Sequence, residues 1–277
     1  MNIKTVTVLG ANGTMGCNVA GIFASFGNAK VYMVSRLKEK SQQAAGRAAR
    51  SVKASSVEKN LIPADYAQMQ QCIAQSDLVF ESVAEDLETK RNVTREAAKF
   101  LREDALFCSG TSGLSITTLS QELSQQQRSR YLGVHFYNPP YSMPLCELIP
   151  TEQTDATVFS SLKDYLTQVL FRTVVEVKDS PAFLGNRIGF QFINEALQFA
   201  EQYQDSGGID YIDAILGRFS GRSMAPLVTS DFVGLDVHKA IVDNLYENTL
   251  DYAHETFRLP SFVQNLIDQG LLGRKSN

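Results

Sequence analysis

Short apolar runs alternate with helix-type segments along the first 180 residues of the chain. Seven runs have the length and composition of buried strands, at residues 4–9, 29–34, 78–83, 105–109, 131–135, 146–149 and 173–177. Helix-type segments lie between the first four runs, one ending near residue 26 and others at about 39–58, 66–76 and 90–101. This alternation predicts parallel β–α–β units and a doubly wound sheet of the α/β class.

The pattern changes after residue 180. Residues 184–203 predict one long helix, whose apolar stripe has steps of three and four residues: Ile188, Phe192, Ala196, Phe199 and Tyr203. The stripe suits an internal core and an inter-subunit contact equally well. Shorter helices are predicted over 209–219, 236–246 and 262–269, without alternating strands. We therefore predict an α/β domain over residues 1–179 and an all-helical domain over residues 180–277.

Composition and charge narrow the class of protein. A hydrophobic fraction of 44% and a charged fraction of 20% are typical of a soluble globular protein, and a net charge of −4 argues against a nucleic-acid binder. The four cysteines form no CxxC pair, so we expect no metal site, no disulfide framework and a reducing compartment. No signal peptide or membrane-spanning run is visible. We expect a cytoplasmic protein without membrane or nucleic-acid partners.

A glycine-rich turn, residues 10–16 (GANGTMG), follows the first predicted strand and opens the first helix. Glycines in this place allow a tight turn and let backbone N–H groups approach a pyrophosphate. The spacing is GxxGxxG, one residue longer than the common GxGxxG. A plain structural turn is the alternative. We predict a Rossmann-like dinucleotide site that includes Gly10, Gly13, Thr14, Met15 and Gly16.

The end of the second predicted strand normally selects the cofactor. An acidic residue there binds the ribose 2′-hydroxyl of NAD, whereas an arginine accommodates the 2′-phosphate of NADP. This chain has Ser35 and Arg36, followed by Lys38 and Lys40. Arg36 could pair with a 2′-phosphate, stack on adenine, or simply begin a solvated helix. The cofactor is therefore predicted to be NAD or NADP, and our hypothesis is that NADP(H) is accepted.

His135 ends an apolar run and precedes Pro139 and Pro140, so we expect it at the end of a strand. Glu147 follows twelve residues later, and a histidine with a nearby carboxylate is a plausible proton-transfer pair. A lone histidine at a strand end is also commonly structural. We interpret His238 and His254, the only other histidines, as structural.

Several segments resemble the 3-hydroxyacyl-CoA dehydrogenase family. Besides the glycine turn, four segments are similar to the family motifs EAVxExxxxK, NTSSLxI, GxHFxNP and LxEvI, at residues 80–90, 109–116, 133–139 and 145–149. Three more resemble segments of the family's helical domain, at residues 180–187, 223–236 and 270–276. The resemblance covers nearly the whole chain in order.

The resemblance implies hydride transfer between a nicotinamide cofactor and C3 of a 3-hydroxyacyl-CoA, as in fatty acid β-oxidation. It makes His135 the general acid/base and Glu147 the residue that orients it, while Ser112 and Asn186 bind the substrate oxygen on C3 or the nearby acyl carbonyl. Histidine suits this role because its ordinary pKa of ~6.5 lets it accept and return a proton near neutral pH.

The resemblance also implies binding residues and a homodimer. The ribose and nicotinamide end of the cofactor is contacted by Glu85, Lys90, Asn138 and Lys275. Ser51 falls where the family contacts coenzyme A, with Lys53 and Lys59 as possible phosphate partners. The helical domain resembles the family's dimerisation and substrate-covering domain.

Each of these side chains has a simpler interpretation. Ser112 could cap a helix, and Asn186 could be an ordinary polar residue at a helix start. Lys90 could be a surface residue. Asp231 and Asp236 are interpreted as helix caps.

Four departures from the family pattern keep other functions open. The turn is longer, the second strand lacks its acid, and the closing GxGFY segment is missing, as in a shortened chain or a piece of a multifunctional protein. Gly110 replaces an asparagine, which removes a side chain near the nicotinamide. The alternatives are a dehydrogenase of a non-CoA hydroxy acid, such as a sugar acid or a carnitine-like substrate, and a non-catalytic NAD(P) sensor.

Overall fold

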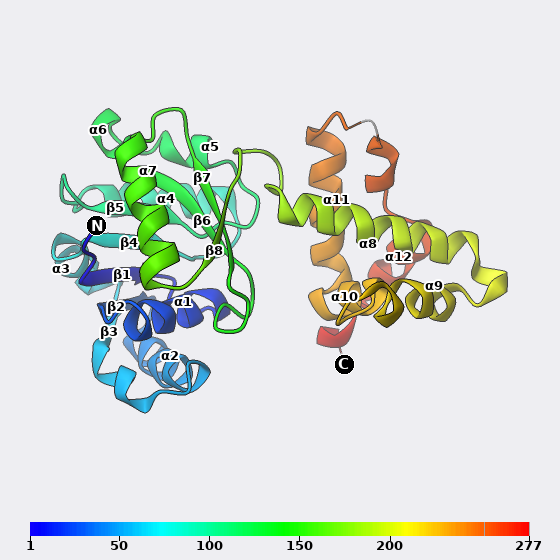
Figure 1. Cartoon of the computed structure of the whole chain (residues 1–277), viewed down its shortest axis with the longest axis horizontal. Helices are drawn as coiled ribbons and strands as arrows, with labels where there is room; N and C mark the ends of the chain where they lie inside the picture. The colour runs from blue at the N-terminus through cyan, green and yellow to red at the C-terminus, as the bar shows by residue number, and fades with distance from the viewer. Residues whose placement is uncertain (252, 277) are drawn as a thin grey trace. The chain divides into compact units, whose positions relative to one another are not determined.

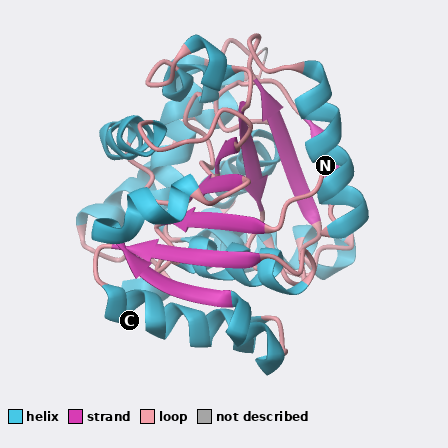
Figure 2. Ribbon diagram, turned by 90° about the vertical axis from the view of Figure 1, so that its left-hand side faces the viewer, coloured by secondary structure: helices cyan, strands magenta, loops and turns pink. Residues whose placement is uncertain are grey.

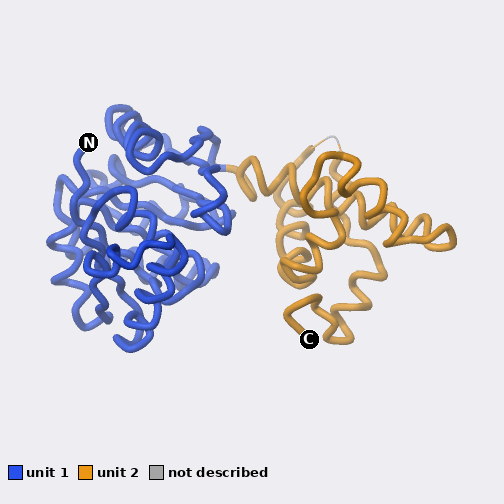
Figure 3. The backbone as a smooth tube through the Cα atoms, turned by 60° about the horizontal axis from the view of Figure 1, so that its bottom comes forward, with its two compact units in different colours: residues 1–179 blue, residues 180–277 orange. Residues whose placement is uncertain are grey.

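The computed structural model describes residues 1–251 and 253–276 of the chain. These residues fall into two compact units, Met1–Asp179 and Ser180–Asn277, which are coloured separately in Figure 3. The division lies where the alternation of strands and helices stops along the sequence.

Unit 1 contains an eight-stranded sheet in the order β3-β2-β1-β4-β5-β6-β7-β8. The strands are β1 (Thr5–Leu9), β2 (Lys30–Ser35), β3 (Leu61–Asp65), β4 (Leu78–Glu81), β5 (Leu106–Ser109), β6 (Tyr131–Phe136), β7 (Leu145–Pro150) and β8 (Thr173–Glu176). All neighbours pair in parallel except β6 and β7, which pair antiparallel. The predicted Rossmann-like fold is confirmed. The strand order reverses at β1, where such sheets bind nucleotides beyond the carboxyl ends of the strands.

Helices cover both faces of this sheet (Figures 1 and 2). They are α1 (Thr14–Ser25), α2 (Lys38–Ser51), α3 (Met69–Ala74), α4 (Leu87–Ala98), α5 (Ile116–Ser120), α6 (Gln125–Arg128) and α7 (Ala156–Asp164). Because both faces are covered, the central strands are apolar almost throughout, as in β1, where Val6, Val8 and Leu9 are fully buried.

Several elements of unit 1 differ from the sequence-based expectation. Strand β3 was not predicted because Pro63 lies within it, and a proline is tolerated here because β3 is an edge strand that pairs only with β2. The predicted helix over 39–58 ends at Ser51, and Lys53 then adopts a positive φ of 54° before a 3-10 helix at Ser55–Asn60. Helices α6 and α7 were also not predicted.

Unit 2 is helical, and no strand occurs among its described residues. Its main helices are α8 (Gly185–Gln202), α9 (Gly208–Leu216), α10 (Pro226–Val233), α11 (Leu235–Asn248) and α12 (Ser261–Asp268). Helix α10 was not predicted. The core of the unit is formed by Ile193, Leu197 and Ala200 of α8 together with apolar residues of the other helices.

The apolar stripe predicted on α8 is largely exposed. Ala196 is buried, but Ile188, Phe199 and Tyr203 are 60%, 40% and 41% exposed. The helix carries a second apolar series, which includes Ile193 and Leu197, and tertiary packing buries that one instead. An internal core therefore does not account for most of the predicted stripe.

Two other interpretations in unit 2 have different outcomes. His238 is fully buried, lies 3.0 Å from the Asn194 side chain, and has its pKa lowered to about 4 by burial, which agrees with a structural role. The interpretation of Asp231 and Asp236 as helix caps is wrong. Asp231 lies within α10, while Asp236 lies in the first turn of α11, whose N-cap is Gly234.

Within residues 1–251 and 253–276, no helix is long and apolar enough to cross a membrane. No group of three or more His, Cys, Asp or Glu side chains in these residues could hold a metal ion. All four cysteines are free and buried.

Candidate active site

The glycine turn lies at the carboxyl ends of β1, β2 and β4. Gly10 has a φ of +78°, and a Cβ atom there would lie 2.4 Å from the backbone oxygen of Ser82. The backbone N–H groups of Gly10 and Ala11 donate to the Val34 oxygen, at 3.0 and 3.1 Å. A Cβ atom on Gly16 would lie 2.6 Å from the Gly10 oxygen. Only glycine fits at these two positions, because position 10 packs against the backbone after β4 and position 16 packs against the backbone of the turn itself.

The turn fits a dinucleotide pyrophosphate. Helix α1 begins at Thr14 after the N-cap residue Gly13, and no side chain caps it. The start of such a helix presents backbone N–H groups to an anion. A cavity of about 470 Å³ lies beside the turn and is lined by Gly10, Asn12, Gly13, Arg36, Tyr66, Ser82, Val83, Ala84, Thr89 and Val93.

Of the predicted cofactor residues, only Gly10, Gly13 and Arg36 line this cavity. Ser35 is buried, and its hydroxyl donates to the Leu37 oxygen at 2.8 Å. The Met15 side chain packs against the hydrophobic core of unit 1. Thr14 is exposed at the first position of α1. Arg36, in contrast, is exposed and lines the cavity together with Gly10 and Gly13.

His135 and Glu147 form a buried pair. They stand directly opposite each other in the antiparallel β6–β7 pair, where facing side chains share one side of the sheet. The Nδ1 atom of His135 lies 2.8 Å from the Oε2 atom of Glu147, and the two residues are 5% and 2% exposed. A carboxylate that accepts from Nδ1–H selects the tautomer in which Nε2 is the basic nitrogen.

Tyr137 adds an aromatic ring and a hydroxyl beside this pair. Its ring centroid lies 4.6 Å from that of His135, and its hydroxyl oxygen is buried. Burial, and after it the negative charge of Glu147, raises the pKa of Tyr137 well above its usual range, so the hydroxyl stays protonated. Sequence reasoning missed Tyr137, although its position two residues after His135 was an available signal.

A buried ion pair lies at the carboxyl end of β4. The Lys90 ammonium is 2.8 Å from Glu81 and 3.3 Å from Glu85, and both Lys90 and Glu81 are almost completely buried. The Ser109 hydroxyl donates to the second oxygen of Glu81 at 2.7 Å. The interpretation of Lys90 as a surface residue is therefore wrong. Sequence reasoning did not identify Glu81 or Ser109, because their partners are distant in the chain.

Glu85 joins this ion pair to the segment that carries Ser112. Its Oε1 atom accepts hydrogen bonds from the Thr111 hydroxyl and from the Ser112 backbone N–H, the latter at 2.7 Å. Ser112 is exposed. It is not a helix cap, because α5 is capped by Ser115, whose hydroxyl accepts from the Thr118 N–H at 3.1 Å.

Gly110 does not leave open space. A Cβ atom there would lie 2.7 Å from the Phe80 ring, which is buried and packs edge-on against Phe23 and Phe136. By the resemblance, Gly110 removes an asparagine side chain near the nicotinamide. In the structure, the Phe80 ring takes up the space next to Gly110.

The remaining predicted residues lie in four separate places. Asn138 is exposed just beyond β6. Ser51 ends α2, close in sequence to a pocket of about 420 Å³ lined by Arg50, Lys53 and Glu58 among others. Asn186 and Lys275 belong to unit 2, where Asn186 is the second residue of α8 and Lys275 pairs with Asp236.

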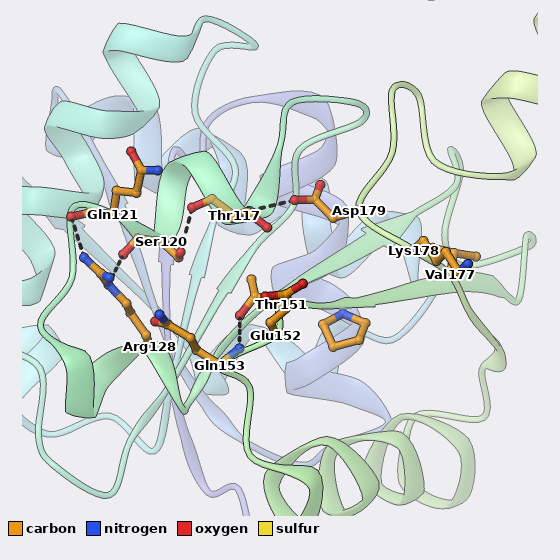
Figure 4. Close-up of a pocket in the computed structure, with 11 residues that line it drawn as sticks. Thr117, Ser120, Gln121, Arg128, Thr151, Glu152, Gln153, Val177, Lys178 and Asp179 are labelled. Carbon is orange, nitrogen blue, oxygen red and sulfur yellow. Dashed lines mark hydrogen bonds between the residues drawn. The ribbon is translucent and has the colours of Figure 1, made fainter. Parts of the chain in front are cut away.

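Unit 1 contains a further cavity of about 630 Å³, shown in Figure 4, whose lining includes none of the predicted site residues. Its most constrained group is Asp179, which accepts hydrogen bonds from the Ser115 hydroxyl and from the Ile116 and Thr117 N–H groups. Arg128 in this cavity donates to three backbone carbonyls. These charged groups have structural partners, so we assign no catalytic role to the cavity.

Comparisons with known proteins agree with this architecture. Residues 5–180 match the family described as "3-hydroxyacyl-CoA dehydrogenase, NAD binding domain", and residues 183–277 match its C-terminal domain. The chain is 33% identical to a 3-hydroxybutyryl-CoA dehydrogenase of Bradyrhizobium diazoefficiens, over 99% of this chain and 93% of that protein. It is 32% identical to the mitochondrial hydroxyacyl-coenzyme A dehydrogenase of Rattus norvegicus, over 99% and 89%.

A third relative, from Bacillus subtilis, is much longer. The chain is 30% identical to this probable 3-hydroxyacyl-CoA dehydrogenase over 74% of its own length but only 26% of the relative. Among solved structures, the (S)-3-hydroxybutyryl-CoA dehydrogenase of Ralstonia eutropha has a TM-score of 0.86 and 28% identity, over 99% of this chain and 96% of that one. The chain therefore belongs to the 3-hydroxyacyl-CoA dehydrogenase family of NAD(P)-dependent oxidoreductases.

Proposed function

We propose that this chain interconverts a 3-hydroxyacyl-CoA and the corresponding 3-ketoacyl-CoA, with His135 as general acid and base. The observation that carries the proposal is the buried His135–Glu147 pair, held in register across β6 and β7. A base within a sheet keeps a constant orientation, and a buried carboxylate behind the ring stabilises its charged form. The names of the relatives support the substrate class.

The proton transfer follows from this geometry. Oxidation of the secondary alcohol removes a hydride from C3 and a proton from the 3-hydroxyl, and Nε2 of His135 takes the proton. Glu147 then faces a positively charged imidazolium, and the same proton returns to oxygen in the reduction. The bound nicotinamide supplies the hydride acceptor at its C4 atom. We assign Ser112 and Asn186 to the C3 oxygen or the acyl carbonyl, where hydrogen-bond donors stabilise developing charge.

The same proposal assigns residues to the cofactor. The backbone of the glycine turn, with Gly10, Gly13 and Gly16, holds the pyrophosphate, and Thr14 and Met15 contribute N–H groups of the first helical turn. The ribose and nicotinamide end is contacted by Glu85, Lys90, Asn138 and Lys275. The hydrogen bond from the Ser112 N–H to Glu85 holds a proposed substrate residue next to a proposed cofactor residue.

Coenzyme A is the proposed carrier of the acyl group. Ser51 is the proposed contact, and the adjacent pocket is lined by the cations Arg50 and Lys53, which suit a phosphorylated ligand. A cytoplasmic location and a role in fatty acid β-oxidation belong to the same proposal. The four free cysteines support a reducing compartment.

Acetoacetyl-CoA tests this function directly. We expect it to drive oxidation of NADH or NADPH, followed as loss of absorbance at the wavelength of the reduced nicotinamide. Free acetoacetate serves as the matched control without coenzyme A and should react far more slowly. Equal rates for both would favour a non-CoA hydroxy acid as substrate. Cofactor binding without turnover of any hydroxy or keto acid would favour a sensor.

We also propose a homodimer formed through unit 2. The support is a set of large apolar side chains exposed along α8 and α9: Ile188, Phe199, Tyr203, Ile209, Tyr211 and Ile215. Exposed apolar surface of this kind is typical of protein interfaces.

Light scattering should therefore give about 61 kDa, twice the 30.6 kDa of one chain. Phe199→Asp should shift the mass toward the monomer. The control Phe171→Asp, which changes an exposed aromatic residue of unit 1, should leave the mass unchanged. A monomeric mass for the wild-type chain would contradict the proposal.

A further inference from the structure

The cavity beside the glycine turn has one charged side chain among its described lining residues, and it is a cation. Arg36 lines it together with Tyr66, with residues of the turn and of the segment after β4, and with two uncharged residues of α4. No carboxylate is among those residues. A site that binds the ribose 2′-hydroxyl of NAD normally offers a carboxylate there, because that hydroxyl needs an acceptor.

The backbone around Arg36 is firmly anchored. Ser35 on one side is buried, and its hydroxyl bonds both the Leu37 oxygen and the Ser41 hydroxyl, at 2.8 and 2.7 Å. On the other side, Leu37 is the N-cap of α2, and its oxygen accepts from the Lys40 N–H at 3.0 Å. The backbone on both sides of Arg36 is thus held by hydrogen bonds, and the Ser35 hydroxyl is already engaged within the fold.

The acidic residue that pairs with Ser35 on the neighbouring strand already has another role. Asp65 stands opposite Ser35 in the β2–β3 pair, but its Oδ1 atom accepts the Ala67 N–H at 3.0 Å and so caps the next helical turn. Asp65 does not line the cavity. It therefore does not replace the missing acid of β2.

The surrounding charge favours an anion. Residues 36–40 contain Arg36, Lys38 and Lys40 against the single carboxylate Glu39, which is three positive charges and one negative, or +2. The same segment begins α2, whose amino-terminal end adds a partial positive charge. An adenosine ribose that ends in a hydroxyl makes little use of this charge, whereas a 2′-phosphate neutralises it.

We propose that this corner is a phosphate subsite and that the chain prefers NADP(H) to NAD(H), with the Arg36 guanidinium donating to the 2′-phosphate. Guanidinium groups suit phosphate because their planar donors can make two parallel hydrogen bonds. This inference rests on the dinucleotide site of the proposed function but not on its chemical step.

Binding measurements test the inference without turnover. The chain has no tryptophan, so the fluorescence of NADPH and NADH can be titrated without interference from the protein's indole groups. Adenosine 2′,5′-bisphosphate and 5′-AMP, compared by calorimetry, differ only in the 2′-phosphate. In each pair, we expect the phosphorylated ligand to bind about tenfold more tightly or better at low salt.

Three variants separate the role of Arg36 from general electrostatics. Arg36→Gln should weaken the binding of NADPH and leave the affinity for NADH within about twofold of the wild type, which removes the preference. Arg36→Asp should reverse the preference in favour of NADH. Lys40→Gln is the matched control, because it removes the same charge from the same segment without lining the cavity. It should change both affinities by less than about twofold.

Several outcomes would overturn the inference. One is a wild-type chain that binds NADH as tightly as NADPH. Another is an Arg36→Gln variant that weakens both cofactors equally, which would mean that Arg36 stacks on adenine. A chain that prefers NADPH but turns over no 3-ketoacyl-CoA would refute the proposed reaction and leave the phosphate subsite intact.

Discussion

Replacing His135 by glutamine is expected to lower kcat by about a thousandfold while leaving dinucleotide affinity unchanged. Glutamine keeps a polar group beside Glu147 but cannot accept the proton of the 3-hydroxyl at neutral pH. The glycine turn proposed to bind the cofactor lies at the carboxyl ends of β1, β2 and β4, whereas His135 lies near the end of β6. Turnover of acetoacetyl-CoA and fluorescence titration of the reduced cofactor measure the two effects separately.

His254→Gln is the matched control for this experiment. It makes the same substitution at a histidine of unit 2 that stacks on Tyr246, and kcat should stay within about twofold of the wild type. A His135→Gln variant that keeps a tenth of the wild-type kcat would refute the role of His135. Loss of cofactor binding together with turnover would instead indicate a structural role.

Replacing Lys90 by methionine is expected to lower the free energy of unfolding by about 3–5 kcal/mol. Lys90 and Glu81 are both buried, and the Lys90 ammonium is the partner of one Glu81 oxygen, at 2.8 Å. Methionine fills the space of the lysine stem but leaves a carboxylate in the interior without its counter-charge. Urea unfolding followed by far-ultraviolet circular dichroism measures the change.

The exposed pair Lys99–Glu96 on α4 supplies the control. Its two charged atoms are 2.7 Å apart, as close as those of the buried pair, but about half of each side chain is exposed. Lys99→Met should therefore lower the free energy of unfolding by less than about 1 kcal/mol. The double variant Lys90→Met, Glu81→Gln should recover part of the loss, because the unpaired charge is gone. Equal effects of Lys90→Met and Lys99→Met would show that burial does not strengthen the pair.

The candidate site shows where sequence reasoning works and where it stops. The sequence pointed to His135 and Glu147 as a pair, and the structure places them opposite each other in β6 and β7. Tyr137 joins them from the same strand end, yet its position was left open in the motif. A motif records which residues recur along a chain and does not report which rings and hydroxyls come together in space.

Buried charges were the feature that was hardest to predict from the sequence. Glu81 and Lys90 are nine residues apart on a strand and a helix, and a charged residue in a helix-type segment is usually exposed. Their burial follows from packing of α4 against the sheet. Similarly, the ring of Phe80 beside Gly110 is a contact between neighbouring strands, so its effect on the nicotinamide site could not be predicted from either residue alone.

The sequence by itself determined the alternation of strands and helices, the place of the glycine turn, the change of pattern near residue 180 and the absence of an acid at the end of β2. These features are local, because periodicity and turn chemistry depend on residues close together in the chain. Only the tertiary structure decided which stripe of α8 is buried, that Lys90 lies inside, and that Arg36 lines the cavity beside the glycine turn without a carboxylate. Those outcomes depend on contacts between distant segments, and burial and charge pairing exist only once these segments have packed together.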